Sequence, residues 1–252
     1  MEALNGETDK VDGRALRWVK HREERTRKFI EITCEAVRKY SYQVSMDQIA
    51  EYAKTSKSIL YRYFPDKLSL QYAVGSYVVG NLVQQIKEAM LCYENPAQMI
   101  KAAIEEYLDF MENNLDLYIF VRIGDLEGEP GSTKMLDFDE VILRTALDAH
   151  NIDVGKKADS LDNNLNSEQI SLLVRGHIGS VALVSMIRNV AEAWLFSRRV
   201  LERPQDYPNF ELSVSDYYVA QLSRDEVIDH IFVWVQGGVL AAFTDNESVT
   251  AN

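Results

Sequence analysis

The chain has 252 residues, five prolines and a net charge of −12, a length that suits one or two domains with a sizeable core. Its two cysteines, Cys34 and Cys92, lie inside helical-looking segments, which excludes a disulfide scaffold and favours a reduced, cytoplasmic chain. The charged first thirty residues predict no secretory signal, and the longest apolar runs are shorter than the roughly 20 residues that a membrane span needs.

The charge is divided unevenly along the chain. Residues 14–70 carry thirteen Lys/Arg and seven Asp/Glu, a balance of +6, whereas residues 71–252 carry thirteen and twenty-eight, a balance of −15. This asymmetry is typical of a basic module joined to an acidic body. Because phosphate repels an acidic surface, we expect any nucleic acid to meet the N-terminal module alone.

Apolar residues recur at helical spacing throughout the chain, and no run alternates with the period of a strand. We therefore predict an all-α fold: an N-terminal three-helix domain followed by a helical bundle. Ser45 with Gln48, and Ser223 with Glu226, have the spacing of capping boxes. Pro65 should end a short helix, because its ring cannot continue the hydrogen-bond ladder. The expected helices cover 26–40, 45–53, 56–64, 66–92, 96–111, 115–126, 133–149, 166–199 and 223–243.

Three segments are expected to be irregular. Residues 150–164 read as a polar loop, residues 203–215 lack periodicity, and the tail from 244 should be frayed. The expected domains are a flexible basic arm (1–20), a helix-turn-helix domain (21–66), a ligand-binding and dimerisation domain (67–245) and a frayed tail (246–252).

Two helices joined by a very short turn, residues 45–53 and 56–64, fit a helix-turn-helix motif. Ile49 and Ala53 on the first helix can meet Leu60 and Phe64 on the second. Packing these residues inward leaves a basic, hydroxyl-bearing outer face on the second helix, which suits the major groove of DNA. The residues of that face are Lys57, Ser58, Tyr61 and Arg62.

This region resembles the TetR family of bacterial transcriptional regulators. The resemblance runs from Thr26 to Tyr77 and lies in "SMDQIAEYA", "TSKSILYRYFPDK" and "LSLQYAV". It implies a three-helix DNA-binding domain whose third helix reads the major groove, and a helical ligand-binding body that dimerises through its last two helices. With the outer-face residues, it makes the candidate DNA contacts Ser45, Thr55, Ser56, Lys57, Ser58, Tyr61, Arg62, Tyr63 and Lys67.

Two positions depart from the family pattern. The turn that usually holds Gly-Val is Lys54-Thr55 here, and a positive φ at Lys54 would cost on the order of 1 kcal/mol. The glycine expected between the first two helices is also absent from "RKYSYQVS". The alternative for Tyr61 and Tyr63 is packing between the third helix and the body. The basic arm can follow phosphates, enter a minor groove, or form a solvated helical extension.

In the body, "IEEYLDFMENNLDLYIFVRIGDL" is rich in aromatic and Met side chains, which can line a pocket or simply pack in a core. A helix interrupted at "ENN" would open space between helices. A loose resemblance of "LLVRGHIGSVALVSMIRNVAEAWL" to the TetR subgroup that controls lipid genes in high-GC Gram-positive bacteria implies a long-chain acyl ligand. The candidate ligand-binding residues are Tyr107, Phe110, Met111, Tyr118, Phe120, Arg122 and Arg175.

The last helix is apolar on more than one face, so it needs burial from two sides, and a homodimer would supply it. No histidine has a metal-binding spacing and no phosphate loop or nucleophile motif is found, so an enzyme, a metal site and a cofactor are not expected. The sequence therefore predicts a ligand-responsive repressor that binds operator DNA and an apolar effector, with no membrane partner. A DNA-bound protein-interaction scaffold and a constitutive DNA binder without a ligand stay open as alternatives.

Overall fold

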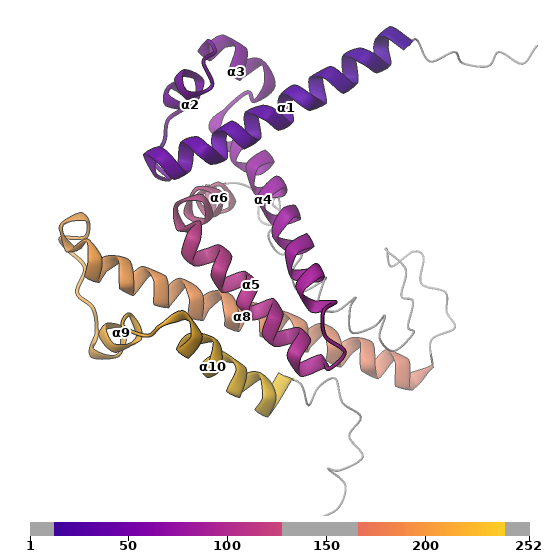
Figure 1. Ribbon diagram of the computed structural model, residues 1–252, viewed down its shortest axis with the longest axis vertical. Helices are drawn as coiled ribbons and strands as arrows, with labels where there is room; N and C mark the ends of the chain where they lie inside the picture. Colours follow the sequence, from indigo (N-terminus) through magenta and orange to yellow (C-terminus); the bar gives the residue numbers. More distant parts are fainter. Residues whose placement is uncertain (1–12, 128–165, 240–252) are drawn as a thin grey trace, which may run out of the picture.

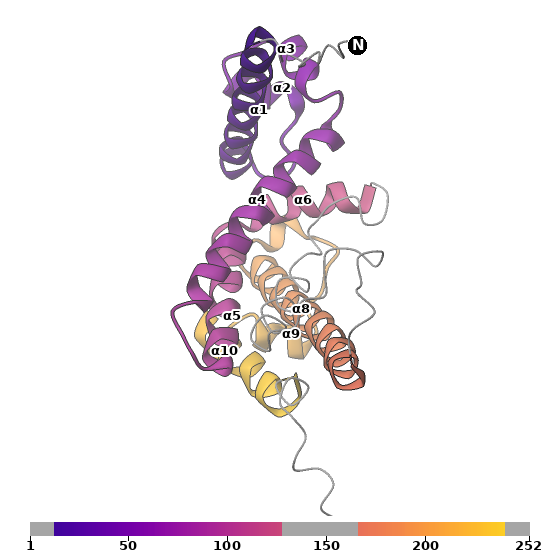
Figure 2. The same ribbon diagram turned by 90° about the vertical axis from the view of Figure 1, so that its right-hand side faces the viewer.

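A computed structural model describes residues 13–127 and 166–239, and this part of the chain is helical without strands. The all-α prediction is therefore confirmed. Figures 1 and 2 show an N-terminal domain of short and long helices, from which α4 descends into a lower bundle. In chain order the elements are α1 Gly13–Tyr40, α2 Met46–Tyr52, α3 Lys57–Tyr63, α4 Lys67–Met90, α5 Pro96–Asn113, α6 Leu115–Glu127, α8 Ser167–Glu202, η3 Pro204–Asp206, α9 Val214–Val219, α10 Arg224–Trp234 and the π-helical turn η4 Val235–Val239.

The expected helix starts are confirmed by their hydrogen bonds. Ser45 Oγ accepts from the Gln48 backbone N–H at 3.2 Å, while Gln48 Oε1 accepts from the Ser45 backbone N–H at 2.8 Å. Asn166 with Gln169, and Ser223 with Glu226, form the same reciprocal box. Each box satisfies backbone donors that a helix leaves without intrahelical partners, and so fixes where the helix begins.

Two elements differ from the expectations. Residues 13–20, expected in a flexible arm, form the first two turns of α1, since the segment offers good helix formers and no proline to stop them. Residues 214–219 form α9, where Ser213 and Asp216 make a capping box; the sequence predicted no helix here and placed residues 214 and 215 in the irregular segment. The helix expected at 133–149, the loop at 150–164 and the tail from 244 lie outside the described residues.

Two hydrophobic cores share α4. Val37, Ile49, Leu60, Leu70 and Val74 belong to the N-terminal core, to which α6 adds Leu117, Phe120 and Val121. The second core joins the later turns of α4 to α5, α8 and α10, with the fully buried Trp194 among its members. Because one continuous helix contributes to both cores, a rotation of α4 moves the two parts of the molecule together.

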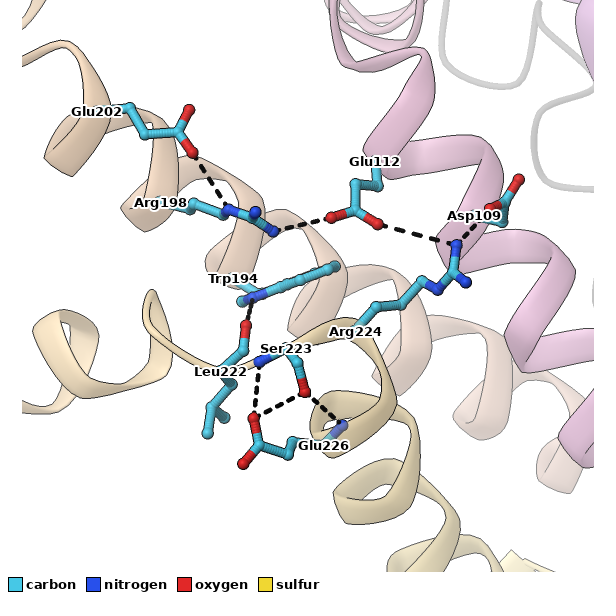
Figure 3. Close-up of polar contacts among 9 residues, drawn as sticks. All are labelled: Asp109, Glu112, Trp194, Arg198, Glu202, Leu222, Ser223, Arg224 and Glu226. Atoms are coloured by element: carbon cyan, nitrogen blue, oxygen red, sulfur yellow. Dashed lines mark hydrogen bonds and ion pairs between the residues drawn. The ribbon is translucent and has the colours of Figure 1, made fainter.

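Ion pairs close the lower bundle (Figure 3). Arg198 of α8 pairs with Glu112 of α5 at 2.8 Å, and Arg224 of α10 pairs with Asp109. The Trp194 indole N–H donates to the Leu222 carbonyl at 3.0 Å. These contacts hold α5, α8 and α10 as one unit, so we treat this bundle as the rigid part of the body.

Helix α8 contains a longer apolar segment than we expected from the sequence. Among the described residues it is long and apolar enough, by length and composition, to cross a membrane, with a mean hydropathy of 1.7 over its best window. Only 29% of that window is buried within the chain. The expectation that every apolar run is too short for a span is therefore corrected, because small and hydroxyl residues let the apolar segment continue. Core helices of soluble proteins also have this composition.

Candidate DNA interface and effector cavity

The helix-turn-helix core has the predicted packing. Ile49 and Leu60 are fully buried and Phe64 is nearly so, while Ala53 packs against them as a partly buried residue. Ser56 caps α3, since its Oγ accepts from the Ile59 backbone N–H at 3.3 Å. The short α3 is thus held by its core face and its cap, which leaves its other face outward.

The turn between α2 and α3 has the strained backbone that its sequence implied. Lys54 takes a φ of 49°, in the left-handed region that favours glycine. The Thr55 backbone N–H then donates to the Ala50 carbonyl at 3.0 Å, which closes the turn. Ser41 takes a φ of 74° at the second position that lacks an expected glycine. At both positions a residue with a side chain therefore takes the left-handed conformation that glycine adopts without penalty.

The outward face of α3 carries Lys57, Ser58, Tyr61 and Arg62, all exposed. Lys57 Nζ lies 2.7 Å from the Asp47 carboxylate, and this hydrogen bond raises the pKa of Lys57. Its ammonium also lies 5.8 Å from the Tyr61 ring centroid. Lys57 is therefore a cation oriented by Asp47 beside an exposed phenol, and a DNA acceptor would compete with Asp47 for it.

The two tyrosines of the motif have different surroundings. Tyr61 is exposed and its ring contacts Lys57. Tyr63 is half-buried, and its ring centroid lies 5.1 Å from that of Phe29 and 5.8 Å from the Arg62 guanidinium carbon. Tyr61 thus has the geometry of a backbone contact, whereas Tyr63 combines packing on α1 with a partly exposed edge.

The remaining candidates lie at helix starts. Ser45 and Ser56 use their oxygens as cap acceptors, and each hydroxyl keeps a proton that can be donated to a phosphate. Thr55 is half-exposed in the turn. Lys67, in the first turn of α4, places its ammonium 5.6 Å from the centroid of the buried Phe120 ring. Lys67 therefore rests on α6 in this structure and would have to turn outward to meet a phosphate.

A small cavity lies where α4, α5, α6 and α8 meet. Its volume is about 30 Å³, close to the share of one water molecule in the liquid. Apolar side chains dominate the lining, and Arg188 is its charged member. The lining residues are Val78, Val79, Leu82, Tyr107, Phe110, Tyr118, Val121, Val184 and Arg188.

Two buried phenols and two half-buried charged side chains gather at one side of this cavity. The Tyr118 hydroxyl donates to Glu192, and Arg122 lies 3.6 Å from the same carboxylate. Burial, with Glu192 nearby, raises the pKa of both Tyr107 and Tyr118, so both phenols stay protonated and act as donors. Arg122, Arg188 and Glu192 together give this side a net positive charge, which is suited to a polar end of an otherwise apolar ligand.

The structure places only some of the candidate ligand-binding residues at the cavity. Tyr107, Phe110 and Tyr118 line the cavity, and Arg122 borders it through Glu192. Met111 is fully buried in the body core, Phe120 belongs to the N-terminal core, and Arg175 is not among the cavity residues. Arg188 and Glu192, which lie at or beside the cavity, were not among the candidates predicted from the sequence. The pattern that could have indicated them is a pair of charged residues one helical turn apart in an apolar helix.

Polar contacts at the start of α6 connect the N-terminal domain to the lower bundle. The Asp116 carboxylate accepts from the Tyr42 backbone N–H at 3.3 Å and from Arg199 of α8 at 3.0 Å. Nearby, Arg38 of α1 donates to Asn114 Oδ1 at 3.0 Å. The interruption between α5 and α6 therefore connects the N-terminal domain to the rigid bundle.

These features define a helix-turn-helix DNA-binding protein with a separate helical body. Comparison with known proteins shows what this domain is similar to. Residues 33–74 match the family model of bacterial regulatory proteins, tetR family, so the N-terminal domain is similar to the DNA-binding domain of that family.

Individual relatives agree with this assignment. An uncharacterized HTH-type transcriptional regulator of Mycobacterium tuberculosis is 34% identical over 109 residues, which are 41% of this chain and 47% of that protein. The HTH-type transcriptional activator FasR of Mycolicibacterium smegmatis is 31% identical over 135 residues, 48% of this chain and 62% of FasR. The chain thus spans about half the length of the curated relatives it matches.

The similarity of fold covers more of the chain. A tetR-family transcriptional regulator from Streptomyces coelicolor aligns with a TM-score of 0.53 over 88% of this chain and 87% of that one, at 18% sequence identity. At this identity the likeness shows the fold alone, an N-terminal helix-turn-helix domain followed by a helical domain.

Proposed function

We propose that this chain is a cytoplasmic, sequence-specific transcriptional regulator that reads operator DNA with α3 and is released from it by an apolar effector. One observation carries the DNA-reading part: a capped α3 presents Lys57, Ser58, Tyr61 and Arg62 outward from the basic end of an otherwise acidic chain. Hydroxyl and cationic side chains on one helix face can contact base edges and phosphates together.

Binding as a homodimer is part of the proposal. Exposed apolar residues follow one face of α8 at helical spacing, namely Ile170, Val174 and Ile178, and α10 exposes Val233 and Trp234. Covering these residues with a second copy would remove a large apolar surface from water and set two α3 helices for successive major grooves.

The effector is proposed to occupy an expanded form of the α4–α5–α6–α8 cavity. The closed cavity has room for about one water, so a ligand with a long apolar chain must bind a minor, open conformation. Arg122 and Arg188 beside the two protonated tyrosines support an acyl compound with an anionic end. The similarity to FasR supports lipid-related regulation, although FasR is named as an activator, so the direction of control needs its own readout.

The test starts from DNA selected by the full-length protein from a random duplex library. Lys57→Ala and Ser58→Ala should change the preferred sequence, and the selected duplex should bind at least about tenfold better than a scrambled one. Titration of oleic acid and oleoyl-coenzyme A, with free coenzyme A as the control, should weaken the complex. A reporter gene behind the selected duplex gives the direction of control. Equal binding to selected and scrambled duplexes would refute sequence-specific recognition.

A DNA-bound interaction scaffold is the second candidate, and two observations favour it. The cavity is small, and exposed apolar and aromatic side chains surround a groove of about 600 Å³ formed by the end of α8, η3 and α9. Val214, Tyr217 and Tyr218 are its most exposed members. Operator binding that no apolar compound alters, together with loss of regulation in Tyr217→Ala/Tyr218→Ala, would establish the scaffold instead.

A further inference from the structure

The first half of α1 projects beyond the helix-turn-helix domain. From Arg17 to Lys28 the side chains are exposed, except for the half-exposed Thr26, and Phe29 is the first buried residue of the helix. Figure 1 shows this indigo end of α1 extending past α2 and α3. A helix that leaves the core by several turns gains little from tertiary packing, so a partner is needed to explain its length.

The projection is strongly basic. Residues 13–28 contain seven Lys/Arg and two Asp/Glu, a balance of +5. Going back along α1 from Phe29, the residues on the same face of the helix are Arg25, Arg22 and Trp18, at steps of four, three and four residues. Both acids, Glu23 and Glu24, lie more than about 100° away from that line around the helix. This face, which points the same way as the domain core, therefore carries cations and no acid, while other cations such as Lys20 and Arg27 lie on the opposite side of the helix.

Two cations of this face, Arg22 and Arg25, are not paired with carboxylates of the described residues. Within the described residues neither Arg22 nor Arg25 has a carboxylate within ion-pair distance, whereas Arg27 on the opposite face pairs with Glu31 at 3.1 Å. Arg25 rests 5.9 Å from the centroid of the Phe29 ring, which orients its guanidinium without neutralising it. Trp18, next along the face, is 77% exposed.

The same face borders a groove that reaches the DNA-reading motif. The groove, about 410 Å³ in volume, lies between α1 and the turn joining α2 to α3. Arg25 and Lys28 line the α1 wall together with Glu24, and Lys54 and Thr55 line the other wall. Lys54 takes a left-handed backbone conformation, and Thr55 is a candidate DNA contact. A backbone phosphate adjoining Thr55 would thus find two cations on the α1 wall and one across the groove, against the single carboxylate of Glu24.

We propose that the basic face of α1 binds DNA phosphates that flank the half-site read by α3, with Arg22 and Arg25 as its principal contacts and Lys54 across the groove. The inference rests on the proposed DNA-binding function. A helix about 10–12 Å wide does not fit a minor groove of roughly 6 Å, so helical α1 follows the backbone instead of entering the groove. The interaction is therefore independent of sequence and sensitive to salt.

The experiment compares two variants with the same change in net charge. Arg22→Gln/Arg25→Gln removes cations from the basic face, and Lys20→Gln/Arg27→Gln removes two from the opposite face. The full-length proteins are titrated with a mixed-sequence 30-bp duplex between 50 and 300 mM salt, concentrations of the order over which phosphate contacts lose affinity. We expect the first variant to lower the slope of log K against log salt by about 0.9 for each lost contact, and the second to leave it nearly unchanged.

A charge-retaining variant and a folding measurement complete the design. Arg22→Lys/Arg25→Lys should keep the wild-type slope, because phosphate contacts depend mainly on charge, and circular dichroism should give equal helicity for every variant. Equal slopes for the two Gln variants would overturn the α1 proposal and leave the proposed function intact. If the wild-type protein binds no duplex at all, the proposed function itself fails, so the two failures are distinguishable.

Discussion

At the residue scale, we propose that the phenol of Tyr61 contacts the DNA backbone, because it is exposed beside the cation Lys57. Tyr61→Phe should weaken binding to every duplex by about tenfold, the worth of one hydrogen bond to a charged acceptor. Fluorescence anisotropy on selected and scrambled duplexes measures both losses. Tyr52→Phe is the matched control, since its hydroxyl lies 3.3 Å from Glu35 within the domain. A loss confined to the selected duplex would assign Tyr61 to base reading.

The two cysteines provide a second residue-scale prediction. Burial raises the pKa of the Cys34 thiol to about 11, whereas Cys92 is exposed at the end of α4. Because the thiolate is the reactive form, a disulfide reagent at pH 8 should modify Cys92 rapidly and Cys34 only after unfolding. Counting released chromophore with and without denaturant checks this, and fast modification of two thiols in the native protein would contradict the burial of Cys34.

At the element scale, the turn between α2 and α3 carries backbone strain. Lys54→Gly should raise the free energy of unfolding by about 0.5–1 kcal/mol, because glycine adopts the left-handed conformation without its steric penalty. Ala53→Gly is the control in the same turn. Its φ of −72° is ordinary, so glycine there should lower stability by a similar amount. Urea unfolding of both variants gives the two signs, and a destabilised Lys54→Gly would show that its side chain has another stabilising role.

The start of α6 provides the second element-scale prediction. Asp116→Ala leaves the largely buried Arg199 without its carboxylate and the Tyr42 backbone N–H without its acceptor. We expect a loss of about 3 kcal/mol, typical of a buried pair with one partner removed. Glu202→Ala breaks an exposed pair with Arg198 and should lose less than about 1 kcal/mol. Similar losses in the two variants would show that Asp116 is an ordinary surface partner.

At the scale of the whole molecule, we propose that operator affinity and effector binding are linked through α4, which contributes to both cores. A hundredfold loss of affinity needs about 2.7 kcal/mol of coupling between the two sites. Val184→Phe places a larger side chain in the cavity and should abolish the response to oleoyl-coenzyme A while operator binding stays within about twofold. Titration of the preformed complex measures both properties. An unchanged response would locate the effector elsewhere in the chain.

A second substitution, Met111→Trp, serves to distinguish the effect of filling the cavity from the effect of overpacking the core. Met111 is fully buried outside the cavity lining, so the larger ring should lower stability by about 1–3 kcal/mol.

A homodimer adds a further whole-molecule expectation, with α3 helices roughly 34–36 Å apart on DNA. Sedimentation at micromolar concentration checks the assembly, and a monomer would remove the proposed role of the exposed faces of α8 and α10.

Local patterns were sufficient to predict most helices and the reading motif. The Ser45 and Ser223 boxes, Pro65 and the spacing of Ile49 with Leu60 depend on neighbours a few residues apart, so their physics is contained in short segments. For the same reason, once the buried residues of α3 were identified, its outward-facing residues could be predicted from the helical repeat. The positive φ of Lys54 was suggested by the resemblance to the TetR family, which usually has glycine at this position, and not by a local pattern.

Only the tertiary structure decided which body residues line the cavity and how the two parts are joined. Phe120 and Tyr118 are two residues apart, yet one lies in the N-terminal core and the other at the cavity, because α6 passes between two cores. Asp116 meets Tyr42 and Arg199 across 74 and 83 residues of chain, a separation that no local pattern encodes. Helix spacing says which residues share a face; what that face meets is determined by packing between distant segments.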